Sequence, residues 1–467
     1  MDLWGFARFA KGVGKGAARL ATAWRRWGQE DRVEIEDTYK NELACLQEQL
    51  NEADSEDEKA RIKQEIKAVR HEQRLFYRAR RDLLLSRALV ERMTPKGRIS
   101  AGMPELPASE REMLRIAMTL LEQLEPGKSF ADRFLRGNAF YAAQDFESAL
   151  REYNAALALR PDEPTTLSNR GAALWDLKRY EEALADCNRS LELRPDDPNT
   201  LNNRAVALYG LKRYDEALAD FNRSLELRPG DPDALNNRGN TLGELERYEE
   251  ALADFNRSLE LRPDYPATLN NRGAALCALK RYEEALANLN RSLEVRPDHP
   301  DTLSNRGNAL DGLKRYEEAL ADHNRSLELH PDHPGALNNR GITLCGLKRY
   351  EDGLADFNRS LELRPDDPET LNNRGGTLGH LRRYEGALAD FNRSLELRPD
   401  HPSTMYNIAC LYSLWQRYEE SLQWLGRAIA GHASYRGKAA EDEDFAGLRA
   451  DPQFGPRFQE LTQGDTS

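Results

Sequence analysis

Residues 198–231 read PNTLNNRAVALYGLKRYDEALADFNRSLELRPGD, and copies of this stretch recur along the chain with a constant period of 34 residues. Nine copies in phase begin at residues 130, 164, 198, 232, 266, 300, 334, 368 and 402. A fixed period of this length indicates stacked supersecondary units rather than one globular core. The repeat therefore decides the fold, and it moves the question of function to a surface.

Each copy carries the pattern of two helices. Leu201, Ala205 and Leu208 are spaced at intervals of three and four residues, which is the face of a first helix. A second run with the same spacing begins at Tyr214. Asp197 suits the N-cap of the first helix, and the proline that follows it loses no hydrogen bond at the first helical position. We therefore predict a helix, a short turn and a second helix in every unit.

Small residues recur where the two helices must approach. Counted from the first residue of each copy, position 8 holds Gly171, Ala205, Gly239, Gly273, Gly307, Gly341 and Gly375. Position 20 holds alanine in most copies and glycine at Gly353. Glycine inside a helix costs up to about 1 kcal/mol relative to alanine. Its repeated use therefore predicts close contact between the helices.

This pattern resembles the tetratricopeptide repeat family. The first eight copies match the family at positions 8 and 20 and at the proline of position 32, whereas the last copy departs with Ser421 and Ala433. The resemblance implies an all-α fold, a right-handed superhelical solenoid of about nine antiparallel helix pairs. It also implies that the first helices line the concave side.

Changes in composition divide the chain into five parts. Residues 1–28 form a basic amphipathic segment, residues 29–103 a charged extension with helical or coiled-coil character, and residues 104–129 an N-terminal capping helix. The nine repeats occupy residues 130–435, and residues 436–467 form a C-terminal cap and tail. A solenoid needs caps because its terminal apolar faces would otherwise be exposed to water.

The first segment combines aromatic residues with six basic residues and one acidic residue. The side chains expected to dock are Trp4, Phe6, Phe9, Lys11, Lys15, Arg19, Trp24, Arg25 and Arg26. A helix with this pattern can lie in an anionic membrane surface or bind a partner. A mobile tail and a helix packed on its own protein are the alternatives. The continuous apolar core of a signal peptide is missing.

The second part has helical spacing of apolar residues on both sides of a polar break at residues 51–58. This pattern predicts one long charged helix or an antiparallel helical hairpin. Clean heptads are too few to decide between self-association through a coiled coil and a solvated helical extension.

The amino-acid composition limits the classes of function that this protein can have. A net charge of −12 argues against nonspecific binding to nucleic acid. No apolar run approaches the roughly 18 residues of a membrane span. Five scattered cysteines form no CxxC pair, which favours free thiols in a reducing compartment. We therefore expect a cytoplasmic protein, held at the inner membrane surface if its first segment docks there.

Position 6 is asparagine in eight successive copies: Asn169, Asn203, Asn237, Asn271, Asn305, Asn339, Asn373 and Asn407. A side-chain amide offers both a donor and an acceptor, so a column of amides can grip the backbone of an extended peptide. The column is similar to the asparagine ladder in the superhelix of the O-linked N-acetylglucosamine transferases, whose catalytic domain this sequence lacks. The alternative is a local role, in which each amide bonds to neighbouring backbone or to the asparagine at position 5.

Positions 2, 9, 12 and 13 of the first helix change from copy to copy. In the family these positions face the concave groove, and the side chains expected there include Trp175, Tyr209, Asn240 and Asn308. Such variation is typical of a surface that selects a ligand, and neutral drift would produce the same pattern. Acidic residues near these positions, Asp311 among them, favour a neutral or basic peptide.

The sequence contains no catalytic motif of the types GxxxxGK[ST], HExxH or GxSxG. Its histidines are not accompanied by a ligand set at metal spacing, so neither a metal nor another cofactor is expected. We predict a nonenzymatic adaptor that binds an extended peptide segment of a protein partner. The alternatives are a membrane-recruited assembly factor and a regulatory subunit of a separately encoded enzyme, either of which would pack on a folded partner.

Overall fold

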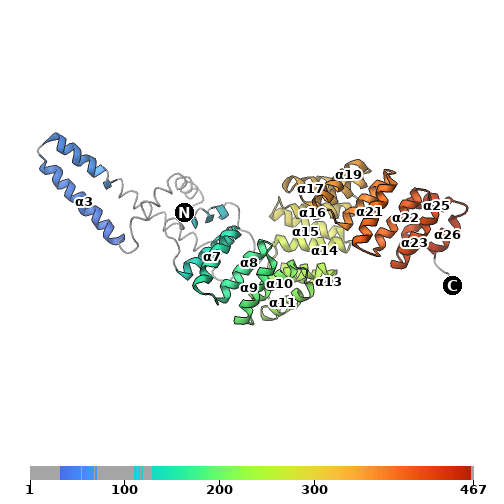
Figure 1. The fold of residues 1–467 in the computed structure, drawn as a ribbon, viewed down its shortest axis with the longest axis horizontal. Helices are drawn as coiled ribbons and strands as arrows, with labels where there is room; N and C mark the ends of the chain where they lie inside the picture. Colours follow the sequence, from blue (N-terminus) through green and yellow to red (C-terminus); the bar gives the residue numbers. More distant parts are fainter. Residues whose placement is uncertain are drawn as a thin grey trace. The chain divides into compact units, whose positions relative to one another are not determined.

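The computed structural model describes residues 32–53, 55–67, 69–70, 110–112, 114–115, 117–118 and 129–463. Every regular element in these ranges is a helix, which confirms the all-α fold class (Figure 1). The predicted docking segment, residues 1–28, lies outside the described residues. No helix within these ranges is both long and apolar enough to cross a bilayer.

Each repeat contributes a first helix of 13 residues and a second helix of 14 residues. The first helices are α6 (Phe130–Ala142), α8 (Pro164–Asp176), α10 (Pro198–Gly210), α12 (Pro232–Glu244), α14 (Pro266–Ala278), α16 (Pro300–Gly312), α18 (Pro334–Gly346), α20 (Pro368–His380) and α22 (Pro402–Leu414). The second helices are α7 (Phe146–Leu159), α9 (Tyr180–Leu193), α11 (Tyr214–Leu227), α13 (Tyr248–Leu261), α15 (Tyr282–Val295), α17 (Tyr316–Leu329), α19 (Tyr350–Leu363), α21 (Tyr384–Leu397) and α23 (Tyr418–Gly431).

Packing divides the chain after Leu245 into two compact units. Within each unit, consecutive helices contact one another: α8 packs on α9 and α9 on α10 in the first unit, and α14, α15 and α16 pack in the same order in the second. The prediction of tandem helix pairs is therefore confirmed.

The helix starts follow the predicted caps. The Asp197 carboxylate accepts hydrogen bonds from the backbone N–H groups of Asn199 and Thr200 at the start of α10, and Pro198 is its first residue. These bonds satisfy donors that have no partner inside the helix.

The helix ends use a device that the sequence does not reveal. Lys212 adopts the left-handed backbone conformation at φ 59° in the turn after α10. Its N–H donates to the carbonyl of Tyr209, and the N–H of Arg213 donates to that of Leu208. This is a Schellman ending, which glycine usually supplies. A lysine in its place gives no recognisable stop signal.

The small residue at position 8 is explained by an aromatic or aliphatic side chain of the second helix. A Cβ added to Gly341 would lie 2.6 Å from the ring of Phe357, which is itself buried. Gly375 would meet Phe391 at 2.8 Å in the same way. The predicted close approach of the two helices is therefore present in both repeats.

An arginine at position 7 connects three helices. Arg306 of α16 donates from Nε and Nη2 to both oxygens of Asp322 on α17, at 2.6 Å each, and from Nη1 to Asn290 Oδ1 of α15 at 3.0 Å. The same bridge is made by Arg170, Arg204, Arg340 and Arg374. Charge-assisted bidentate pairs of this kind fix geometry as well as adding stability.

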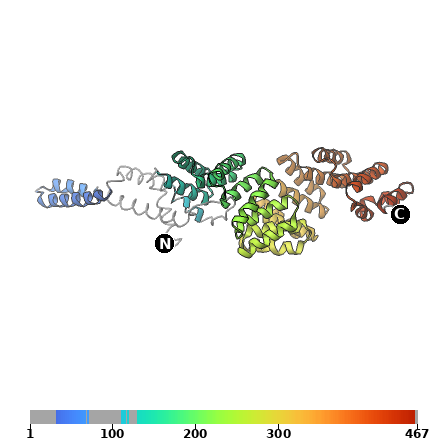
Figure 2. The same ribbon diagram turned by 90° about the horizontal axis from the view of Figure 1, so that it is seen from below.

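Outside the repeats, α3 (Arg32–Glu52) ends before a break at residue 53, and a second helix covers residues 56–67. The two helices lie side by side in both views (Figures 1 and 2). Ile62 and Ile66 of the second helix are buried. This part of the extension is therefore a hairpin and not one long helix, and self-association through it stays a prediction.

The segment after α23 covers the last repeat. It consists of α24 (Tyr435–Glu441), the 3₁₀ turn η1 (Glu443–Phe445), α25 (Ala446–Ala450) and α26 (Gly455–Gln463). Phe445, Leu448 and Phe458 are fully buried in one cluster with Met405 of α22 and Leu425 of α23. These contacts remove the apolar face of the last helix pair from water, as a solenoid end requires.

Candidate functional site

The asparagine column is a chain of amide hydrogen bonds between repeats. In the second unit, Asn373 Nδ2 donates to Asn338 Oδ1 at 3.0 Å, Asn338 Nδ2 to Asn339 Oδ1 at 3.4 Å, and Asn339 Nδ2 to Ser304 Oγ at 3.3 Å. The same bond from position 6 to position 5 of the preceding repeat is made by Asn203, Asn237, Asn305, Asn339, Asn373 and Asn407, whereas Asn169 donates to Asn138 at position 9. The local role left open by the sequence is therefore present in the structure, and the binding of a peptide backbone stays a prediction.

Members of the column differ in accessibility. Asn169 is fully buried and donates to Asn138 Oδ1 at 2.9 Å, and Asn203 is 2% exposed and donates to the side chain of Ser168. These two amides lie inside the scaffold and offer no surface to a ligand. Half-buried members are Asn237, Asn271, Asn305, Asn339, Asn373 and Asn407.

The variable positions are not uniformly exposed either. Ala172 and Val206, both at position 9, are buried because α8 and α10 pack directly on each other. Position 9, which varies and is expected to face the groove, therefore offers no open surface in these two repeats. In the five repeats that begin at residues 232 to 368, the residue at position 9 is half-buried or exposed, and Ile342 is 40% exposed. A repeat is named below by its first residue.

The four side chains predicted beside the column are all half-buried: Trp175, Tyr209, Asn240 and Asn308. The buried indole N–H of Trp175 finds no acceptor in the described part of the chain. Tyr209 donates to Glu244 Oε1 at 3.3 Å, and burial raises the pKa of its hydroxyl. The structure therefore leaves these four residues partly accessible.

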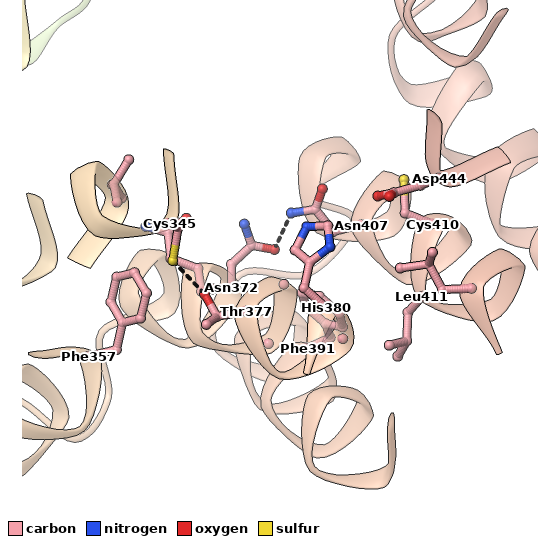
Figure 3. Close-up of a pocket in the computed structure, with 16 residues that line it drawn as sticks. Cys345, Phe357, Asn372, Thr377, His380, Phe391, Asn407, Cys410, Leu411 and Asp444 are labelled. Atoms are coloured by element: carbon pink, nitrogen blue, oxygen red, sulfur yellow. Dashed lines mark hydrogen bonds between the residues drawn. The ribbon is translucent and has the colours of Figure 1, made fainter. Parts of the chain in front are cut away.

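A cavity of about 230 Å³ opens over α20, between α18 and α22 (Figure 3). It is lined by positions 5, 6, 8, 9, 10, 12 and 13 of these first helices, which include Asn373 and Asn407 of the column, and by Phe357, Phe391 and Asp444. Gly376 lies on its floor, and a Cβ built there would have no atom within 4 Å. The space exists because α20 presents no side chain at this position.

The two ends of the cavity differ in chemistry. Cys345 and Phe357 lie at one end, while Cys410 and Asp444 lie side by side at the other (Figure 3). Asp444 comes from η1 in the C-terminal segment. Burial raises the pKa of its carboxyl, and the neighbouring Asp442 raises it further. Burial likewise raises the pKa of the Cys410 thiol well above its usual range.

Cys410, Asp442 and Asp444 place potential metal-ligand atoms within 4.8 Å of one another. Both oxygens of Asp442 already have donors, the Tyr406 hydroxyl at 2.7 Å and the backbone N–H of Asp444 at 3.1 Å. Asp442 therefore serves as the N-cap of η1, and this group supports no metal assignment.

Sequence reasoning missed a buried histidine next to the groove. His323 of α17 is fully buried, with Nε2 3.4 Å from Asp311 Oδ2, and the Thr343 hydroxyl donates to the same oxygen at 2.6 Å. Four other repeats carry phenylalanine at this position: Phe221, Phe255, Phe357 and Phe391. Comparing the copies at position 24 could have identified it. The Asp311 carboxylate was expected to make the groove acidic. One of its oxygens already contacts His323 and Thr343, which makes that oxygen less available to a ligand.

The sequence matches known repeat families over most of the array. Profiles described as tetratricopeptide repeat match residues 162–230, 196–264, 230–295, 264–332, 366–433 and 301–368, and one described as TPR repeat matches residues 137–178. The chain belongs to the tetratricopeptide repeat family. The likeness of the asparagine column to that of the O-linked N-acetylglucosamine transferases stays a prediction.

Solved structures share the tetratricopeptide repeat fold. The Cut9–Hcn1 hetero-tetramer of the APC/C is 14% identical and aligns with 94% of this chain and 98% of its own, with a TM-score of 0.50. A tetratricopeptide repeat protein from Parabacteroides merdae is 20% identical over 54% of this chain and 100% of its own, with a TM-score of 0.43. YrrB, described as a TPR protein with an unusual peptide-binding site, is 23% identical over 42% and 97%, with a TM-score of 0.32. No curated protein matches the chain.

Proposed function

We propose that this protein is a nonenzymatic adaptor whose first helices bind an extended peptide segment of a partner. Tetratricopeptide repeat arrays are typical protein-interaction scaffolds. The cavity over α20 is the observation that carries the proposal of a peptide site, because its walls combine the constant asparagines of position 6 with positions 9, 12 and 13, which vary between repeats. Asn373 and Asn407 each use one amide N–H in the column. Each keeps a second N–H with which to hold a peptide carbonyl.

The test fills the cavity without disturbing the column. Gly376→Leu places a side chain in the open space, whereas Gly437→Leu makes the same change at an exposed helical glycine of α24, outside the first helices, that also has no atom within 4 Å of an added Cβ. Peptides are selected from a random displayed library on the full-length protein, and their affinities are measured by fluorescence anisotropy. We expect Gly376→Leu to weaken binding by about tenfold or more and Gly437→Leu to leave it unchanged.

Misfolding would not explain such a loss, because leucine is a better helix former than glycine by up to about 1 kcal/mol. The melting temperature of Gly376→Leu should therefore equal or exceed that of the wild type. Full affinity in the folded Gly376→Leu variant would contradict the proposal.

A second candidate, a scaffold for a folded partner, is favoured by a row of exposed apolar side chains near the ends of the second helices. The row recurs at position 30 and consists of Leu159, Leu193, Leu227, Leu261, Val295, Leu329 and Leu363, with exposures from 37% to 53%. Exposed apolar rows often mark interaction sites. Partners bound by this row should be lost from affinity-purified complexes of Leu193→Ser and Leu227→Ser, but retained by Gly376→Leu.

The basic segment at residues 1–28 adds a membrane role to either proposed function, since it would bring the protein to an anionic membrane surface. Sedimentation with vesicles containing phosphatidylserine tests it. The full chain should pellet with the vesicles, and a chain lacking residues 1–28 should stay in the supernatant. Equal pelleting of both chains would remove the membrane role.

A further inference from the structure

The Asp444 carboxylate lies at one end of the cavity and has no lysine or arginine partner among the described residues. Its thiol neighbour Cys410 carries no positive charge. Burial raises the pKa of its carboxyl, and the negative charge of Asp442 raises it further. His380 is the cationisable group that acts on it, and its ring is stacked on Tyr350 with the centroids 5.1 Å apart.

The same cavity also has apolar walls, with space for the aliphatic part of a long side chain. Ile342, Leu411 and Leu414 line it together with the glycine floor of α20. Repeat 368 alone has glycine at positions 8, 9 and 12, namely Gly375, Gly376 and Gly379. About 230 Å³ greatly exceeds the roughly 30 Å³ occupied by one water molecule, so the cavity suits a side chain better than an ion.

We propose that the cavity over α20 receives a lysine or arginine side chain of the bound peptide, with its cation at the Asp444 carboxylate. The aliphatic stem lies along Leu411 and Leu414 while the charged end reaches Asp444, as long basic side chains do when they cross an apolar surface. An acidic side chain is excluded by repulsion from Asp444 and Asp442. This inference rests on the proposed function and names the residue class that the groove selects.

Specificity then comes from the C-terminal segment rather than from the repeats. Asp444 belongs to η1, and its position is fixed by Asp442, which caps that turn, and by the buried ring of Phe445. The last repeats supply the shape of the cavity, and the cap supplies its charge. A cap of this kind therefore contributes to ligand choice in addition to closing the core.

The test uses an array of short neutral peptides in which each position in turn carries lysine, norleucine or glutamate. Norleucine keeps the stem of lysine and lacks its cation. Full-length wild type, Asp444→Asn, Glu443→Gln and Gly376→Leu are compared. Glu443→Gln is the matched control, because it removes one negative charge at the adjacent exposed residue, which does not line the cavity. Thermal melting confirms that each variant is folded.

In the wild type and in Glu443→Gln, lysine at one peptide position should bind about tenfold more tightly than norleucine, which corresponds to about 1.4 kcal/mol. In Asp444→Asn this preference should fall below about twofold, while norleucine peptides bind as before. A lysine preference that survives in Asp444→Asn, or the lack of any such preference in the wild type, would overturn the inference.

The two proposals fail in different ways. If peptides bind the wild type and Gly376→Leu equally, the groove is not the binding site, and the proposed function falls together with the inference. If Gly376→Leu abolishes binding while lysine and norleucine peptides bind the wild type alike, only the basic-residue pocket is refuted. Absence of peptide binding to the wild type would refute both.

Discussion

The repeats that begin at residues 266 and 300 have nearly the same sequence but different arginine bridges. Arg306 makes two 2.6 Å bonds to Asp322. In the preceding repeat, Asn288 replaces the aspartate, and Arg272 donates one bond of 3.1 Å to it. The Nε of Arg272 is buried and has no acceptor among the described residues, and burial lowers the pKa of its guanidinium.

This difference shows that copies of one repeat need not be equally stable. Nη1 of Arg306 bonds to Asn290 in the preceding repeat, whereas Nη1 of Arg272 bonds within its own repeat. The repeat with asparagine therefore lacks both the charge pair and this connection between repeats. Because a solenoid is held together by nearest-neighbour contacts, we expect repeat 266 to open more readily than repeat 300.

The largest expected effect is at position 8. A Cβ at Gly307 would lie 2.5 Å from the buried ring of His323, whereas at Gly273 it would meet the branched end of Leu289 at 2.6 Å. A ring cannot yield as a leucine does, so Gly307→Ala should lose about 2–3 kcal/mol and Gly273→Ala about 1 kcal/mol or less. Urea unfolding followed by circular dichroism measures both. Equal losses would mean that the second helices shift equally easily.

Breaking the arginine bridge should have the next largest effect. Asp322→Ala leaves Arg306 partly buried without its carboxylate, and it should lose about 2 kcal/mol. Asn288→Ala removes only one bond to Arg272 and should lose about 1 kcal/mol or less. Hydrogen exchange of α16 and α17 in the first variant, and of α14 and α15 in the second, gives the local values. A larger loss in Asn288→Ala would reverse our ranking of the two repeats.

Restoring the bridge should stabilise repeat 266. Asn288→Asp gives Arg272 a carboxylate, and we expect a gain of about 1 kcal/mol at neutral pH, measured as slower exchange of α14 and α15. Pairing with arginine depresses the folded-state pKa of a carboxyl. The gain should therefore be present above about pH 4 and be lost as the pH falls below it. Exchange that does not slow at pH 7 would show that Arg272 is held by other contacts.

The smallest effect concerns thiol reactivity. Burial raises the pKa of Cys277 in repeat 266 to about 11, so only about one thiol in a thousand is ionised at pH 8. Iodoacetamide should modify exposed Cys45 first, and its rate at Cys277 should rise about tenfold from pH 8 to pH 9. Mass spectrometry of the peptides follows each site.

Cys345 provides an internal control for Cys277, because it holds the same position in the repeat that begins at residue 334. Asn288→Asp should slow the modification of Cys277 by a factor of about two to five and leave Cys345 unchanged, if opening of repeat 266 exposes the thiol. An equal change at both cysteines would show that the substitution acts on the whole unit.

Much of the scaffold could be predicted because its information is local. The spacing of Leu201 and Leu208, the cap at Asp197 and the glycines at position 8 each act within one helix pair, and the structure has the helices where these residues indicate. The left-handed lysine at the helix ends and the buried His323 were not anticipated, since neither residue type is a usual signal for its position.

The candidate site could be predicted only in part. The sequence identifies position 6 as a continuous column of asparagines. It does not show that Asn169 is buried while Asn373 is half-buried, because the residue type is the same at both positions. Accessibility depends on how closely neighbouring first helices approach, as between α8 and α10. The repeat pattern does not encode that separation.

The sequence by itself determined the all-α repeat architecture, the starts of its helices and the positions that vary between copies, because periodic side chains dictate local structure and nearest-neighbour packing. Only the tertiary structure decided which of those positions form a cavity. Gly376 and Asp444 are far apart in the chain, and the fold of the C-terminal segment brings a carboxylate to the open glycine surface of α20. The proximity of residues so far apart in the chain depends on packing between helices, which no local sequence pattern specifies.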